Sequence, residues 1–113
     1  MIDNLAQALQ LMERMQATLP IDTMLDPPSQ TALRSQLPAG VGRGRCKVTE
    51  VHYIGDEGGI VCGLDFGVPD ANSRQFISIT HLAFAPPSPL WREILDYQKH
   101  RTKRLLRLRR TAP

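Results

Sequence analysis

The chain has 113 residues, of which 42% are hydrophobic and 22% charged, the usual composition of one globular domain. Two cysteines are too few for a disulfide scaffold, and no apolar run approaches the roughly 20 residues that a membrane-spanning helix needs. The start of the sequence lacks the basic segment and the continuous apolar core of a signal peptide, so we expect a cytoplasmic protein.

Charge is distributed unevenly along the chain. Residues 1–98 contain 7 Lys and Arg against 11 Asp and Glu, which gives −4, whereas residues 99–113 contain 7 Lys and Arg and no acid, which gives +7. The two values sum to the formal net charge of +3. Such asymmetry is typical of proteins that bind a polyanion or an acidic protein surface. We therefore divide the chain into a single α+β domain, residues 1–98, and a basic helical arm, residues 99–113.

The first predicted element is a helix over residues 3–19. Its apolar residues recur at helical spacing, and either Asp3 or Asn4 provides an N-cap. Pro20 ends the helix, because a proline disfavours helical geometry at the residue before it. We expect the apolar stripe to pack on a sheet or on a partner copy, while its methionines also suit an adaptable docking face.

Residues 20–44 are rich in Pro and Gly and are interpreted as a connection, with one or two helical turns over residues 29–36. Alternating glycines near its end lack the preceding strand and the following helix of a phosphate-binding loop, so we interpret them as a flexible lead-in. Arg43, Arg45 and Lys47 make this edge of the chain locally basic.

The centre of the chain predicts three β-strands, over residues 45–54, 60–67 and 74–85. These stretches hold most of the β-branched and aromatic residues, and short segments rich in turn-forming residues join them. The expected fold class is therefore α+β: an N-terminal helix, a three-stranded antiparallel β-meander and a C-terminal basic helix. A fourth short strand within residues 36–44 would give an SH3-like small barrel, which is the alternative.

Two details of these strands can be predicted. A five-residue glycine-rich loop between the first two places Ile54 opposite Ile60 and His52 opposite Cys62. The face of the first strand that joins the apolar face of the second then consists of Cys46, Val48, His52 and Ile54. The third strand is apolar on both faces, so either both faces are covered or a bulge near residues 80–81 switches them.

Two cysteines and two histidines are the candidates for a metal site or a nucleophilic site. Both residue types bind zinc, and a histidine can activate a cysteine nucleophile. These four residues are Cys46, His52, Cys62 and His81. Their spacing, C-x5-H-x9-C-x18-H, lacks the short clips of structural zinc sites. No oxyanion hole is evident beside a Cys62–His52 pair, and a cysteine among apolar residues is inert. We therefore expect no metal, no cofactor and no enzymatic activity.

The second helix is predicted over residues 89–109, with Ser88 as its N-cap and Pro89 at its first position. Its first half is apolar, and Trp91 is expected to be its largest contribution to the core. Its acids precede its cations, an order that complements the helix macrodipole.

The end of this helix carries the candidate binding site. Seven cations fall within residues 99–110, interleaved with three leucines, a density beyond that of an ordinary solvated helix end. We expect it to bind RNA or a ribonucleoprotein through phosphates, without reading bases, because no aromatic RNA-binding motif accompanies it. The alternative is an adaptor that docks on an acidic protein surface, and anionic lipid is less favoured. The candidate binding residues are Arg43, Arg45, Lys47, Lys99, Arg101, Lys103, Arg104, Arg107, Arg109 and Arg110.

Overall fold

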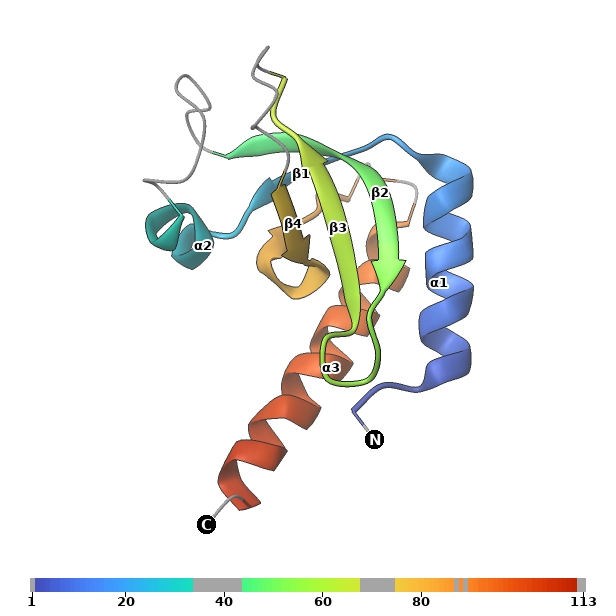
Figure 1. Ribbon diagram of the computed structural model, residues 1–113, viewed down its shortest axis with the longest axis vertical. Coiled ribbons are helices and arrows are strands. Elements are labelled where there is room, and N and C mark those ends of the chain that lie inside the picture. The colour runs from blue at the N-terminus through green and yellow to red at the C-terminus, as the bar shows by residue number, and fades with distance from the viewer. Residues whose placement is uncertain (1, 34–43, 68–74, 87, 89, 112–113) are drawn as a thin grey trace.

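The computed structural model of the chain describes residues 2–33, 44–67, 75–86, 88 and 90–111. The elements in chain order are α1 (Leu5–Thr18), β1 (Ile21–Leu25), α2 (Pro27–Ala32), β2 (Arg45–Tyr53), β3 (Ile60–Asp65), β4 (Gln75–Ser78), the 3-10 helix η1 (Ile79–His81), β5 (Leu82–Ala83) and α3 (Trp91–Thr111). The strands form one curled antiparallel sheet in the order β4-β3-β2-β1-β5 (Figure 1). The α+β class is thereby confirmed, with five strands in place of the expected three.

Strand β1 lies in the stretch that the sequence indicated as an irregular connection. Ile21, Thr23 and Leu25 are buried and Asp22 is exposed, which is the alternation of a half-buried strand. β1 pairs with β2 on one side and with β5 on the other, so it is an interior strand of the sheet. The additional strands are thus β1 and β5, whereas the alternative strand within residues 36–44 falls almost entirely outside the described residues.

Helix α2 follows β1 and begins earlier than the sequence indicated. Its N-cap is Asp26, whose Oδ1 accepts a hydrogen bond from the backbone N–H of Ser29 at 2.8 Å. Ser29, the expected cap, lies inside the first turn because Pro27 and Pro28 suit the first helical positions, where no backbone N–H is needed.

The hairpin of β2 and β3 has a register one residue away from the predicted one. Val51, not His52, pairs with Cys62, and the pairing becomes irregular between Val48 and Glu50. The extra residue that β2 holds at this point is a β-bulge, which changes the face on which the following residues lie. The predicted pairing of His52 with Cys62 is therefore wrong.

Burial along β2 agrees with the prediction before the bulge and differs from it after the bulge. Before the bulge, Cys46 and Val48 are buried as expected. After it, Val51 takes the core position, His52 is exposed, and Ile54 is 63% exposed beyond the end of the strand. A pattern of period two assigns faces only while the register is continuous, so one inserted residue inverts every assignment that follows.

The predicted third strand is divided into β4, η1 and β5. β4 pairs with β3 and β5 pairs with β1, so the turn carries the chain from one edge of the sheet to the other. The Ser78 hydroxyl caps this turn by accepting a hydrogen bond from the backbone N–H of Thr80 at 3.3 Å. The interruption lies near residues 80–81, where the sequence allows a bulge, but a 3-10 turn produces it.

The core lies between the inner face of the curled sheet and helices α1 and α3. Its largest fully buried side chains are Tyr97, Met15, Leu25, Ile60, Leu64, Ile79 and Ile94. Trp91, expected as the main contribution of the second helix, is only partly buried, and Tyr97 takes that role two turns later. Figure 1 shows α3 passing behind the sheet and its C-terminal half projecting beyond it.

Candidate functional site

Helix α3 has one face that packs on the body along the first half of its length. Ile94 and Tyr97 are buried on this face, and Arg101 is 3% exposed. The same helical spacing continues to Leu105, which is half-buried, and to Leu108, which is 54% exposed. The face that packs on the body therefore extends into the arm, where the body no longer covers it.

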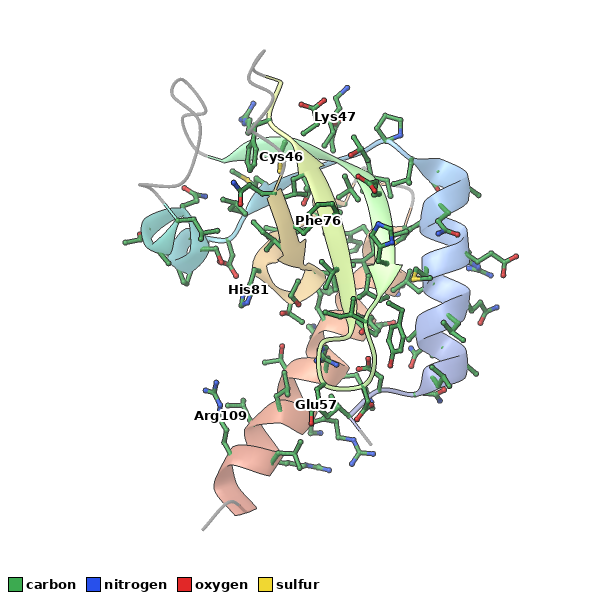
Figure 2. The ribbon with its side chains drawn as sticks, viewed as in Figure 1. Cys46, Lys47, Glu57, Phe76, His81 and Arg109 are labelled. Carbon is green, nitrogen blue, oxygen red and sulfur yellow. The ribbon has the colours of Figure 1, made fainter. Side chains whose placement is uncertain are left out.

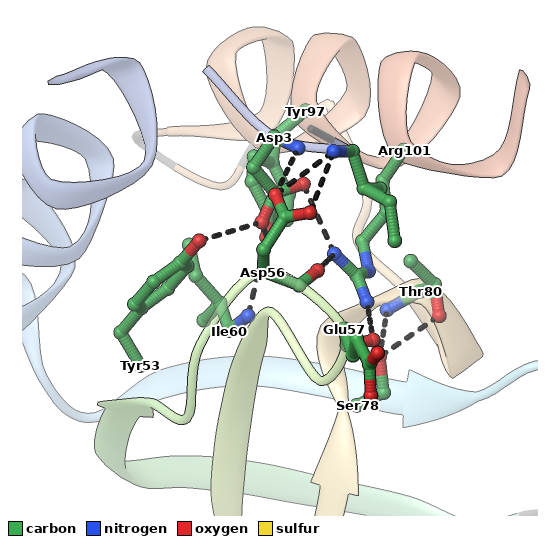
Figure 3. A network of polar contacts seen from close by, with 10 residues as sticks. Asp3, Tyr53, Asp56, Glu57, Ile60, Ser78, Thr80, Tyr97 and Arg101 are labelled. Atoms are coloured by element: carbon green, nitrogen blue, oxygen red, sulfur yellow. Dashed lines mark hydrogen bonds and ion pairs between the residues drawn. The ribbon is translucent and has the colours of Figure 1, made fainter. Parts of the chain in front are cut away.

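Arg101 is anchored in a buried polar network (Figure 3). Its Nη1 donates to Asp3 Oδ1 at 3.0 Å and to the backbone oxygen of Asp56 at 2.8 Å, and its Nη2 donates to the backbone oxygen of Glu57. The Asp3 side chain is 0% exposed, so solvent does not reach the ion pair. Arg101 is therefore part of the folded interior, and its guanidinium is not accessible to a phosphate.

Two tyrosines complete the environment of Asp3. The hydroxyls of Tyr97 and Tyr53 donate to Asp3 Oδ2 at 2.8 Å and 3.2 Å, and the Tyr97 oxygen accepts from the backbone N–H of Ile60 at 3.1 Å. Burial, together with the hydrogen bond to Asp3, raises the pKa of Tyr97 above its ordinary value. Tyr97 therefore stays protonated and remains a hydrogen-bond donor at neutral pH.

Asp56, in the turn between β2 and β3, holds the start of the chain. Its carboxylate accepts hydrogen bonds from the backbone N–H groups of Asp3 and Ile2 at 2.8 to 2.9 Å, and these bonds lower the pKa of Asp56. The network thus ties the first residues, the β2–β3 turn and α3 together. Asn4, not Asp3, serves as the N-cap of α1, because its side chain accepts from the backbone N–H of Gln7.

The other cations in the described part of the arm are exposed. They are Lys99, Lys103, Arg104, Arg107 and Arg109. Lys99, Lys103 and Arg107 recur every four residues, so they lie along one side of the helix, away from the packed face. Residues 99–113 contain no acid, so the arm does not neutralise its own positive field. The side chain of Arg110 lies outside the described residues.

The second group of candidate cations lies at the other end of the molecule. Arg45 and Lys47 are exposed on β2, and Lys47 Nζ lies 4.0 Å from Asp22 Oδ1. Figure 2 shows Lys47 and Arg109 at opposite ends of the view. Arg43 lies outside the described residues. The described members of the two groups therefore do not form one continuous surface.

The cysteines and histidines do not converge as a catalytic or metal site would require. Cys46 and Cys62 are buried, and burial raises the pKa of each thiol to about 12. The bulge in β2 turns His52 away from Cys62, and its Nε2 lies 3.2 Å from Glu50 Oε1. His81 is exposed in η1. Among the residues that the structure describes, no group of three or more His, Cys, Asp or Glu is placed to hold a metal ion.

Both thiols are expected to resist alkylation in the native protein and to react after denaturation, because burial removes access and suppresses the thiolate. Intact mass after iodoacetamide treatment, with and without denaturant, measures this directly. The expected result is no added mass in the native sample and two modifications in the unfolded one. Rapid native labelling of Cys62 would contradict its position in the core.

Comparison with known proteins does not assign the chain to a family. No protein-family model, curated protein or solved structure matches the chain. None of the helices in the described ranges combines the length and apolar character of a membrane span. The charge and projecting geometry of the arm are thus the features that best indicate a function.

Proposed function

We propose that the protein is a non-enzymatic accessory protein that binds RNA or a ribonucleoprotein through its basic arm. The observation that carries this proposal is the row of exposed cations on a helix that projects beyond the body, in a segment without acids. Lys and Arg in such a row attract phosphates and release the counterions that surround a nucleic acid. Arg101 is not included, because its guanidinium is buried against Asp3.

The geometry favours contacts to the backbone of the nucleic acid over reading of its bases. Lys99 and Arg107 are eight positions apart on the helix, with Lys103 midway, which is about 12 Å at about 1.5 Å per residue. A row of this length meets successive phosphates, and such contacts position a nucleic acid without recognising its sequence. Arg45 and Lys47 lie at the opposite end of the body, so we treat them as a separate contact.

Binding to single-stranded RNA is expected to weaken with salt and to depend little on sequence. With about four phosphate contacts, the slope of log affinity against log salt is about −3, and each Lys or Arg removed reduces it by about 0.7. Fluorescence anisotropy with labelled oligonucleotides measures both quantities. The variants are Lys103→Ala and Arg104→Ala, and Arg92→Ala, an exposed cation earlier on the same helix, is the matched control.

Truncation after Thr102 removes most of the arm cations but retains Arg101 and its ion pair, so the body is expected to stay folded without RNA affinity. Affinity that survives this truncation would place the binding site elsewhere. Absence of affinity for every nucleic acid tested at low salt would exclude the proposal.

A second candidate is a protein-interaction adaptor, which a different property of the arm favours. Leu106 and Leu108 are 48% and 54% exposed, and phosphate binding has no use for them. Apolar anchors flanked by cations suit a groove with an acidic rim on a partner protein. Replacing both leucines by serine leaves RNA affinity unchanged under the first proposal and abolishes capture of a nuclease-insensitive partner under the second.

We also propose that the curled sheet is an SH3-like small barrel. The order β4-β3-β2-β1-β5 supports this proposal, since a single 3-10 turn joins the two edge strands. An experimental structure tests it through the separation of β4 and β5 around the turn.

A further inference from the structure

Phe76 presents an aromatic ring on the outer face of the sheet, away from the core. It lies on β4 and is 53% exposed, although its ring rests on the backbone of Gly63 in β3. A Cβ at position 63 would stand 3.1 Å from Phe76 Cε1, so the glycine allows the ring to lie this close to the sheet. The ring of His52 has its centroid 6.1 Å from that of Phe76, at an interplanar angle of 51°, so it lies beside the ring and leaves it open to solvent.

Two cations lie on the same face of the sheet as this ring. Lys47 of β2 pairs with Asp65, which follows Gly63 by two residues on β3. Because Gly63 pairs with Phe76, the side chains of Lys47 and Phe76 lie on one face, and Arg45, two residues before Lys47, shares it. With strands about 4.8 Å apart and a rise of about 3.3 Å per residue, the backbones of Lys47 and Phe76 are roughly 12 Å apart. One small β-domain commonly binds about 4 or more nucleotides, so a single bound strand reaches both.

Three acids also lie on this face, and each has a partner among the described residues. The pairs are Glu50 with His52, Asp22 with Lys47, and Asp65 with the backbone N–H of Gly67. These acids disfavour a phosphate directly beside the ring, but they do not repel an uncharged base. Arg45 is exposed at the start of β2 and makes no ion pair with the described residues, so its guanidinium is available to a phosphate.

We propose that Phe76 stacks on a base of single-stranded RNA, with Arg45 binding a neighbouring phosphate. The inference rests on the proposed function and adds the class of nucleic acid to it. Stacking on an aromatic side chain accepts any base, since every base has a π face, so it agrees with binding that depends little on sequence. It requires an unpaired base, because the bases of a duplex are stacked on one another. Figure 2 shows Phe76 between Lys47 and Arg109 along the long axis of the molecule, so the ring lies between the two groups of cations.

Fluorescence anisotropy of the full-length protein with three labelled probes tests this inference. The probes are a single-stranded RNA of about 15 nucleotides, the same strand with abasic sites in place of its bases, and the duplex form of the first strand. Phe76→Ala is expected to weaken binding of the intact single strand by about five- to a hundredfold, the usual effect of losing one stacked base. Its affinities for the abasic strand and for the duplex are expected to equal those of the wild type, because neither probe offers an unpaired base.

Further substitutions separate stacking from other roles of the side chain. Phe76→Leu keeps an apolar side chain without a π face and is expected to lose as much affinity as Phe76→Ala, whereas Phe76→Trp is expected to bind as the wild type does. Phe76→Ala leaves the slope of log affinity against log salt unchanged, and Arg45→Ala reduces it by about 0.7. Leu9→Ala is the matched control, because it removes an exposed apolar side chain from α1, outside the sheet.

Wild-type affinity of Phe76→Ala or Phe76→Leu for the intact strand would overturn the inference. An equal loss of affinity for all three probes, or a similar loss in Leu9→Ala, would also overturn it, because the substitution would then act through the fold.

The inference and the proposed function fail in different ways. If truncation after Thr102 abolishes binding and Phe76→Ala does not affect it, the proposed function stands and the inference is wrong. If the truncated protein keeps an affinity that Phe76→Ala removes, the sheet is the binding site and the arm is not. A wild type that binds none of the three probes at low salt would exclude both.

Discussion

Replacing Arg101 by methionine is expected to destabilise the protein by about 3 to 5 kcal/mol, the usual cost of removing one partner of a buried ion pair. The variant leaves the carboxylate of Asp3 enclosed without its counter-charge. It also removes the donor to two backbone oxygens of the β2–β3 turn. Methionine retains most of the length and apolar surface of the arginine side chain, so the loss reports chiefly on the polar contacts.

Urea unfolding followed by circular dichroism measures this change. Lys103→Met is the matched control, since Lys103 is an exposed cation just after Arg101, and it is expected to change the free energy of unfolding by less than about 0.5 kcal/mol. A value for Arg101→Met that equals the control would mean that the ion pair does not form in solution. The same reasoning predicts that truncation after Gln98 destabilises the body, whereas truncation after Thr102 does not.

Ile79→Asp is expected to abolish cooperative folding. Ile79 is 0% exposed in η1, so the new carboxylate would be buried without a partner. Domains of this kind are stable by only about 5 to 15 kcal/mol, and a buried unpaired charge removes a large part of that margin. Thermal unfolding followed by circular dichroism measures the effect, and a cooperative melt like that of the wild type would contradict the burial of η1.

Ile54→Asp is the matched control, because it makes the same substitution at an isoleucine that is 63% exposed. It is expected to change the free energy of unfolding by less than about 0.5 kcal/mol. The comparison also tests the bulge in β2, because without the bulge Ile54 would face the core and Ile54→Asp would be as damaging as Ile79→Asp.

Several elements could be predicted from the sequence because they depend on neighbours within a few residues. The helical spacing of apolar residues and the break at Pro20 predicted α1. Alternating apolar residues beside a glycine-rich loop predicted the hairpin of β2 and β3. The start signals at Ser88 and Pro89 and the apolar residues that follow them predicted the second helix, whose end is basic by sequence. These are local properties of the chain, so they required no knowledge of the tertiary structure.

The features that could not be predicted from local sequence patterns all lie in the sheet. The alternation over residues 21–25 is visible in the sequence, but it covers only five residues between prolines, so β1 was interpreted as part of a connection. The bulge in β2 adds one residue to the strand, and nothing in the apolar pattern of the sequence indicates its position. The division into β4, η1 and β5 depends on which strand each segment pairs with, and those partners are remote in the sequence.

By itself the sequence determined the α+β class and the uneven charge of body and arm, because both follow from composition and short-range periodicity. Only the tertiary structure decided which arm cations face solvent. Arg101 and Lys103 have the same charge and lie on the same helix, but the partner of Arg101 is Asp3, 98 residues away. Such a pair forms because folding places two enclosed groups of opposite charge together, and no pattern within a few residues of either one encodes it.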